Sequence, residues 1–226
     1  MKRILSCVTL LTAFLIFAGC SAGNISPETE EPSQIVKEIC GIPPPTSDLN
    51  EMDRYCDYIV IGKISDVYVE RLSSEEKMGE KPEFVNDEER MNFTRYKVEV
   101  LEPIKGDFQK GDIIQCDASG GTFKNITEIV HDNAPFPEEG TTYLLFVNKN
   151  ASQEGIRFNY YAYHPYEGIL ELYGDRLIAQ KYSLLWKKPN ASVEEIDAMS
   201  KEERAENSYT LDEAKALIKA AMEYNG

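Results

Sequence analysis

Histidine and cysteine supply many catalytic and metal centres, and this sequence contains few of either. His131 and His164 are its two histidines. A zinc site needs several ligands at suitable spacing, and no motif joins these two residues. We therefore predict that both are ordinary loop residues, and we expect neither a metal nor another cofactor.

Three cysteines lie in the body of the chain, namely Cys40, Cys56 and Cys116. An odd number allows at most one internal pair. A Cys40–Cys56 disulfide would close a short loop and add about 3 kcal/mol on the chain-entropy model. The alternative, which we favour, is that all three are small buried hydrophobic residues.

An aromatic run is the best candidate for a ligand surface. Its members are Tyr160, Tyr161, Tyr163, His164 and Tyr166. Flat amphipathic rings bind sugars, peptides and partner loops at low entropic cost. The competing interpretation, to which we give more weight, is that alternate rings fill the core while the others cover a neighbouring strand.

Motifs of the common enzyme classes are missing. The sequence has no Gly-x-Ser-x-Gly elbow of the α/β-hydrolases and no calcium-binding loop. Its 39 acidic residues are too many for a catalytic carboxylate pair to be located. We expect a non-enzymatic binding protein, and the alternatives are a secreted hydrolase acting through carboxylates or an extracellular protease inhibitor.

The N-terminal region predicts where the chain is sent. Lys2 and Arg3 precede an apolar run, 4–18, and small residues follow it. This is the pattern of a secretory signal, and the run is shorter than the roughly 20 residues of a membrane-spanning helix. An ordinary cut, for example after Ala22, would leave a soluble secreted protein.

Phe17-Ala18-Gly19-Cys20 resembles the lipobox of bacterial lipoproteins, although Phe17 departs from its usual Leu. The resemblance implies that residues 1–19 are a signal peptide and that Cys20 carries a diacylglyceryl group. Two acyl chains anchor a protein stably. We therefore expect a lipid anchor in the cell membrane, with the protein facing the extracytoplasmic side.

Charge restricts the partners that the chain can bind. Its net charge is −15, and loss of Lys2 and Arg3 with the signal peptide would make it −17. Such a charge repels phosphate backbones, so nucleic acid is not expected as a partner. An envelope protein or a glycan is the expected ligand. Residues 20–34 are polar and rich in Glu, Ser and Pro, which is typical of a flexible tether.

Residues 35–56 are predicted to be helical. Residues 35–42 are interpreted as a short helical turn that three prolines end. Asp48 and Glu51 have the spacing of a capping box, which predicts a helix at about 48–55.

Apolar runs bounded by turn residues predict seven or so short strands in 57–182, typical of a sandwich or barrel. The strand at 57–67 contains Gly62, which marks a bulge or bend. Strict alternation at 95–100 predicts a half-buried strand. Residues 70–92 are polar and acidic and are interpreted as a long exposed loop. Further strands are expected at 114–118, 141–147, 157–163, 168–172 and 176–180.

Two helices are predicted in the C-terminal appendage, 183–226. Ser192 with Glu195, and Thr210 with Glu213, have the capping-box spacing. The first helix should run to about 203, and the second should pack an apolar stripe on the domain. That stripe contains Leu211, Ala214, Leu217, Ile218, Ala221 and Met222.

The order of strands and turns from Asp57 to about Gln180 resembles the OB-like barrel of the tissue inhibitors of metalloproteinases and netrin-like modules. The residues that carry the resemblance are Asp57–Ile64, Tyr96–Val100, Ile104-Lys105-Gly106, Gly111–Ile114, Gly120-Gly121, Gly140 and Tyr143–Phe146. The resemblance implies a mainly β fold: an antiparallel OB-like barrel with extra hairpin strands, a short N-terminal helix and two C-terminal helices. Those inhibitors act through a free N-terminal cysteine, and a lipidated Cys20 on a tether has no such role, so the activity is not carried over.

Overall fold

The structure is a computed structural model that describes residues 35–39, 48–77, 79, 84–130, 136–150, 160–162, 168–178, 184–185, 187 and 193–225. All of them belong to the second of two compact units of the chain, Gln34–Gly226. The fold is mainly β, as expected, with two sheets and a few helices.

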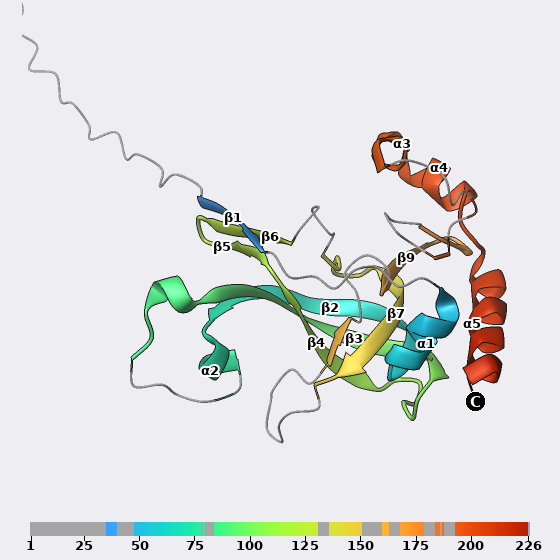
Figure 1. Ribbon diagram of the computed structural model, residues 1–226, viewed down its shortest axis with the longest axis horizontal. Coiled ribbons are helices and arrows are strands. Elements are labelled where there is room, and N and C mark those ends of the chain that lie inside the picture. Colours follow the sequence, from blue (N-terminus) through green and yellow to red (C-terminus); the bar gives the residue numbers. More distant parts are fainter. Residues whose placement is uncertain are drawn as a thin grey trace, which may run out of the picture. The chain divides into compact units, whose positions relative to one another are not determined.

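The larger sheet has seven strands in the order β10-β9-β7-β2-β3-β4-β8. Its longest members are β2 (Tyr58–Leu72) and β3 (Met91–Lys105), which pair along their length (Figure 1). The remaining strands are β4 (Ile113–Ser119), β7 (Thr142–Lys149), β8 (Tyr160–Ala162), β9 (Ile169–Tyr173) and β10 (Arg176–Leu177). The short strand β8 has two neighbours, because it pairs in parallel with β4 and antiparallel with β7.

The smaller sheet has three strands in the order β1-β6-β5. Its strands are β1 (Ile35–Ile39), β5 (Gly121–Phe123) and β6 (Ile126–Val130), and β1 runs parallel to β6. The predicted helical turn at 35–42 is therefore wrong over residues 35–39. β-branched residues such as Ile35 and Val36 favour a strand, and the partner strand lies far away in the sequence.

Strand alternation gives the larger sheet two cores. On β3, the side chains of Tyr96, Val98 and Val100 share one face, which we call the Val98 face. They pack with Val60, Ile64, Ile114, Cys116, Tyr143, Leu145, Val147 and Ile169. On the opposite side of β2 and β7, a second core forms against the helices, with Ile59, Ile61, Leu144 and Phe146 as its strand members.

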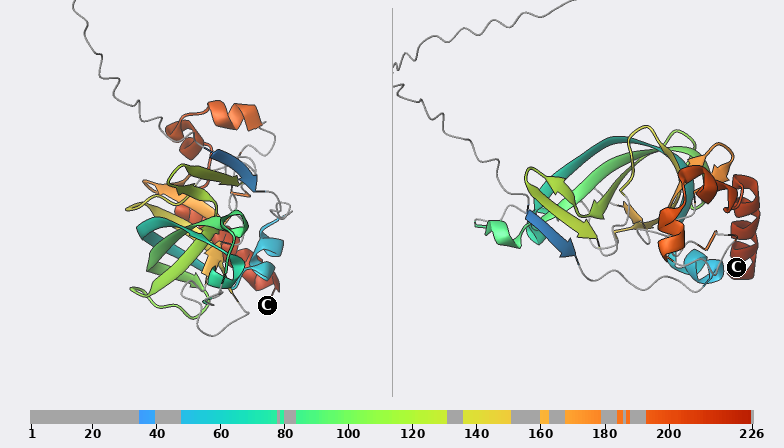
Figure 2. Two further views of the ribbon diagram at one scale, coloured as in Figure 1. Left: turned by 90° about the vertical axis from the view of Figure 1, so that its left-hand side faces the viewer. Right: turned by 90° about the horizontal axis from the view of Figure 1, so that it is seen from above.

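The helices of the second core are α1 (Leu49–Tyr55) and α5 (Leu211–Asn225), which lie side by side (Figure 2). Two of the three predicted helix caps are confirmed, and the third, Ser192 with Glu195, stays a prediction because Ser192 lies outside the described residues. Asp48 Oδ1 accepts from the Glu51 N–H at 2.8 Å, and Thr210 Oγ1 accepts from the Glu213 N–H at 3.2 Å while Glu213 Oε2 accepts from the Thr210 N–H. The apolar stripe of α5 is buried at Ala214, Ile218 and Ala221.

The described C-terminal residues form three helices, not two, because α3 (Val193–Ala198) and α4 (Lys201–Glu206) replace one predicted helix to about 203. Ser200 interrupts the run and begins α4 with a complete capping box to Glu203. A serine that bonds the N–H groups of the following turn favours a helix start over a helix interior.

The predicted exposed loop at 70–92 is also wrong at both ends. Residues 70–72 complete β2 and residues 91–92 begin β3, with α2 (Ser74–Lys77) and the short 3₁₀ helix η1 (Asp87–Glu89) between them. Polar residues of this segment are buried in ion pairs, which the hydrophilic composition did not indicate.

Candidate functional site

A β-bulge determines which charged side chains lie on which side of the sheet. Between Ser65 and Tyr68, β2 gains one residue relative to β3, and Asp66 has a left-handed backbone with φ 51°. Beyond the bulge, residues 68–72 and 91–95 form what we call the β2–β3 extension. The extra residue reverses the alternation of β2, so Arg71 joins the Val98 face while Glu70 lies on the opposite side.

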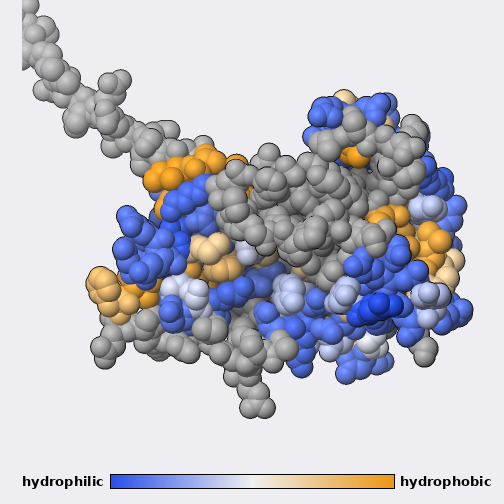
Figure 3. All heavy atoms as spheres, viewed as in Figure 1, coloured by the Kyte–Doolittle hydropathy of each residue, from blue (hydrophilic) through white to orange (hydrophobic). Residues whose placement is uncertain are grey.

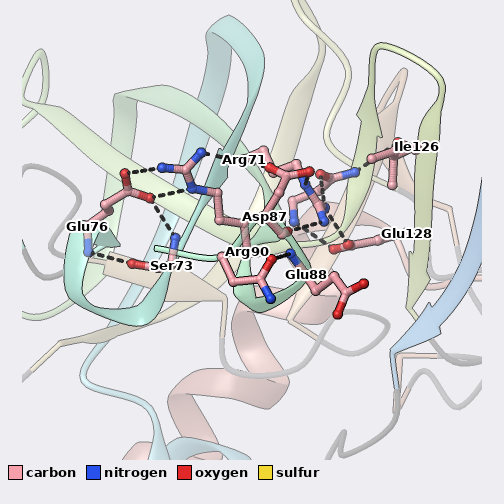
Figure 4. A network of polar contacts seen from close by, with 10 residues as sticks. Arg71, Ser73, Glu76, Asp87, Glu88, Arg90, Ile126 and Glu128 are labelled. Atoms are coloured by element: carbon pink, nitrogen blue, oxygen red, sulfur yellow. Dashed lines mark hydrogen bonds and ion pairs between the residues drawn. The ribbon is translucent and has the colours of Figure 1, made fainter. Parts of the chain in front are cut away.

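The Val98 face of the extension carries a buried polar network (Figure 4). Arg71 and Glu128 form an ion pair at 2.8 Å, with 5% and 4% of their side chains exposed. Glu128 Oε2 also accepts from the Asn92 N–H at 2.6 Å, and Asn92 Oδ1 accepts from Arg71 at 3.1 Å. The Asn92 amide donates to the carbonyls of Gly121 and Ile126. These contacts fasten β5 and β6 to the larger sheet.

The same network holds the segment between β2 and β3. Arg71 donates to the Asp87 carbonyl in η1. Arg90 makes two hydrogen bonds to the Glu76 carboxylate, 2.8 and 3.1 Å long, and that carboxylate also accepts from the Ser73 N–H (Figure 4). The bond from Ser73, followed by the guanidinium of Arg90, lowers the pKa of Glu76.

The opposite face, which we call the Arg95 face, carries a second cluster. Arg95 is buried and lies 3.8 Å from Asp117 and 3.5 Å from Glu70. Lys77 of α2 reaches over this face, with its Nζ 3.0 Å from Asp117 Oδ2 and 4.3 Å from the centroid of the Phe93 ring. We call these five residues the Arg95 cluster.

An aromatic ring borders the Arg95 cluster. The strand register places Asp117 between Arg95 on β3 and Tyr161 on β8. Residues paired in register share a face of the sheet, so Tyr161 lies on the Arg95 face, and 37% of it is exposed. The face thus combines a buried acid, two cations and two rings.

The predicted aromatic run is divided by strand alternation. Tyr160 packs with the core of the Val98 face, where its ring lies 5.7 Å from Tyr58 and 5.4 Å from Phe108. Tyr161 faces the other way, as described above. Tyr163, His164 and Tyr166 lie outside the described residues, as does His131. The prediction of a shared ligand surface therefore stays a prediction, with Tyr161 as its exposed described member.

The cysteines in the described part of the chain are buried thiols. Cys56 donates to the Tyr58 carbonyl at 2.9 Å, and burial raises its pKa to about 12. Burial also raises the pKa of Cys116. Both thiols stay protonated at neutral pH and are poor nucleophiles. Cys20 and Cys40 lie outside the described residues, so the lipid anchor and the Cys40–Cys56 pair stay predictions.

Sequence reasoning missed the Arg95 cluster for a physical reason. Alternation at 95–100 assigned Arg95, Lys97 and Glu99 together to a solvated face, yet Arg95 is buried while Glu99 is exposed. The difference arises from α2, which covers one end of that face. The available signal was the segment 74–77, in which Lys77 follows two glutamates. A helix this short is stable only when it packs against other parts of the protein, so its charged residues should have partners outside it.

Among the described residues, no group of three or more His, Cys, Asp or Glu side chains could hold a metal ion. No helix in the described part of the chain has the length and apolarity that crossing a membrane requires. The sequence matches no protein-family model, and a search of curated proteins finds no match to it.

Proposed function

We propose that this chain is a lipid-anchored extracytoplasmic binding protein, held by diacylglyceryl-Cys20, whose OB-like barrel binds an envelope protein or glycan on the Arg95 face. The observation that carries the proposal is the row Arg95–Asp117–Tyr161 across β3, β4 and β8. Buried charges and an exposed ring on the outside of a sheet form a preorganised polar surface, which is what specific binding requires.

The barrel is supported by the order of strand pairing. β2 pairs with β3, β3 with β4, β4 with β8, β8 with β7, and β7 again with β2. An OB barrel joins its third and fifth strands in parallel, and β4 and β8 pair in this way. Gly62 supports the curvature, because a Cβ at this position would meet Val98 Cγ1 at 2.2 Å.

The location of the binding face is supported by the same analogy. OB folds bind their ligands on the face of their second and third strands and on the loop between the first two strands. Here these parts correspond to β3, β4 and the segment 73–90, which carry every residue of the Arg95 cluster except Glu70 of β2. Because a fold is shared by proteins of many functions, the location of the binding face is argued mainly from the buried charges of the Arg95 cluster.

Site-specific photocrosslinking tests the binding face. A photoreactive residue placed at Tyr161 in the anchored, full-length protein should capture a defined envelope component. Tyr173 on β9 is the matched control, because it is also an exposed tyrosine, at 42%, but lies outside the Arg95 cluster. Equal capture from both positions, or none from either, would remove the Arg95 face from consideration.

The anchor is tested separately. Cys20→Ser should move the protein from the membrane fraction to the soluble extracytoplasmic fraction, and metabolic labelling with an alkyne fatty acid should mark the parent protein but not the variant. A variant that stays membrane-bound would contradict the lipid anchor without affecting the proposed binding face. Neither a hydrolase nor a protease inhibitor is favoured by a specific contact among the described residues.

A further inference from the structure

Lys77 occupies a position in which proteins bind cationic groups. Its ammonium lies over the Phe93 ring, 4.3 Å from the centroid, and 3.0 Å from the Asp117 carboxylate. An aromatic face and an acidic oxygen beside a cation are the elements of ammonium recognition. The site is built on strands β3 and β4, and the cation is supplied by the separate short helix α2.

The charges of the Arg95 cluster leave one carboxylate for this cation. Arg95 is shared between Glu70 at 3.5 Å and Asp117 at 3.8 Å, so its single positive charge balances one of the two acids. Lys77 balances the other. Because only 3% of the Asp117 side chain is exposed, removal of Lys77 would leave a buried negative charge that water solvates poorly. A cation of the same kind is the group that would replace it.

Lys77 is held less firmly than the residues that surround it. Its side chain is 30% exposed, and it is the last residue of a helix of four residues. Its contact with Asp117 Oδ2 is close enough for an ion pair but lacks the direction of a hydrogen bond. By contrast, Phe93, Arg95 and Asp117 lie in paired strands and are buried.

We propose that the Phe93–Asp117 site binds a primary alkylammonium group, such as a lysine side chain of a basic partner, and that Lys77 is an internal occupant that competes with it. The proposal rests on the proposed function, because it assigns a ligand chemistry to the Arg95 face. Tyr161 borders the site and supplies a further ring. The net charge of −15 attracts cationic ligands toward the protein.

Titration of full-length variants tests the competition. The probes are a short lysine-containing peptide, the same peptide with norleucine in place of lysine, and spermidine, each monitored by NMR. If Lys77 fills the site about nine-tenths of the time, Lys77→Ala should bind the lysine peptide about tenfold more tightly than the parent protein. Lys77→Arg, which keeps a cation in place, should bind as weakly as the parent.

Matched controls isolate the site. Lys97→Ala removes the same charge from the same face, but Lys97 pairs with Asp66, so this variant should bind as the parent does. Adding Asp117→Asn to Lys77→Ala should abolish the gain, and if that double variant does not fold, Lys77→Ala with Phe93→Leu serves instead. Tighter binding of the lysine peptide than of spermidine indicates a protein ligand, and the reverse order indicates a free polyamine.

Two outcomes overturn the proposal. One is equal affinity of the parent, Lys77→Ala and Lys97→Ala for every probe, and the other is equal binding of the lysine and norleucine peptides. Either result leaves the proposed function intact if crosslinking from Tyr161 still captures an envelope component. Loss of that crosslinking contradicts the proposed function whatever the titrations give, so the two failures are distinguishable.

Discussion

Glu128 and Lys77 each complete a charged cluster on the β2–β3 extension, but on opposite faces and with different support. Glu128 belongs to the paired strand β6 and is 4% exposed, and both of its oxygens are bonded. Lys77 ends a four-residue helix and is 30% exposed. The network on the Val98 face is therefore held by a paired strand, whereas the contact of Lys77 on the Arg95 face rests on the end of a short helix, and we propose that only the second can be displaced by a ligand.

The largest effect is expected from Glu128→Gln. This change leaves the buried Arg71 guanidinium with only the exposed carboxylate of Asp87, 3.9 Å away, and breaking a buried pair in this way costs about 3–5 kcal/mol. Chemical denaturation should show this loss in the free energy of unfolding. Replacing both Arg71 and Glu128 with leucine should recover part of it. A loss below about 1 kcal/mol, the range of surface pairs, would contradict the assignment of this network as structural.

Glycine-to-alanine substitutions measure how closely β5 packs against β3 on the Val98 face. Gly121 and Gly111 both have positive φ, 111° and 93°, but a Cβ at Gly121 would lie 2.5 Å from Thr94 Oγ1, whereas a Cβ at Gly111 meets no atom within 4 Å. Both alanine variants carry the backbone strain. Gly121→Ala should lose a further 1–3 kcal/mol, approximately, through overpacking. Equal unfolding free energies for the two variants would contradict the close approach of β5 to β3.

A smaller effect is expected from Lys77→Met. Lys77 is partly exposed and Arg95 remains 3.8 Å from the buried Asp117, so the loss should fall between the about 0–1 kcal/mol of exposed pairs and the about 3–5 kcal/mol of a broken buried pair. Denaturation midpoints should therefore shift less than for Glu128→Gln. A loss comparable to that of Glu128→Gln would mean that Lys77 is as structural as Glu128, and the contrast between the two faces would disappear.

The smallest effect concerns pH. The folded-state pKa of Glu76 is lowered, first by the Ser73 N–H and then by Arg90. Its contribution to holding α2 is therefore fully present above the ordinary pKa of 4.5 and decreases as pH falls through the lower folded value. The protection factors of the Ser73 and Glu76 amides, which correct for the intrinsic slowing of exchange at low pH, should decrease on acidification in the parent protein. Glu76→Gln should exchange faster already at pH 7 and show less dependence on pH.

Local signals in the sequence were predictive and non-local ones were not. The caps at Asp48 and Thr210 were found because a side chain and an N–H three residues apart specify them. The start of α4 was missed although Ser200 and Glu203 have the same spacing, because the interpretation continued one helix through them. The strand at 35–39 was missed because its partner, β6, lies some 90 residues away in the register.

The candidate site was less predictable than the fold. Alternation correctly separates two faces of β3, but it cannot show that α2 buries Arg95 while Glu99 stays exposed. Likewise, the tyrosine run indicated aromatic surface, but only the register of β8 shows that Tyr160 and Tyr161 face opposite ways. Burial of charge depends on which segments cover a strand, and that information is spread over distant residues.

The single extra residue at the β2 bulge has a consequence for how this protein can vary. If β2 paired regularly with β3 through this point and kept all its residues, every residue after Ser65 would shift by one position. Glu70 would then lie on the side of Glu128, and Arg71 on the side of Arg95. Two attractive pairings would become two repulsive ones without any change of side chain. A change that flattens the bulge therefore exchanges the electrostatic partners of a whole strand end, whereas deletion of Asp66 keeps them, because Tyr68 would still lie opposite Arg95.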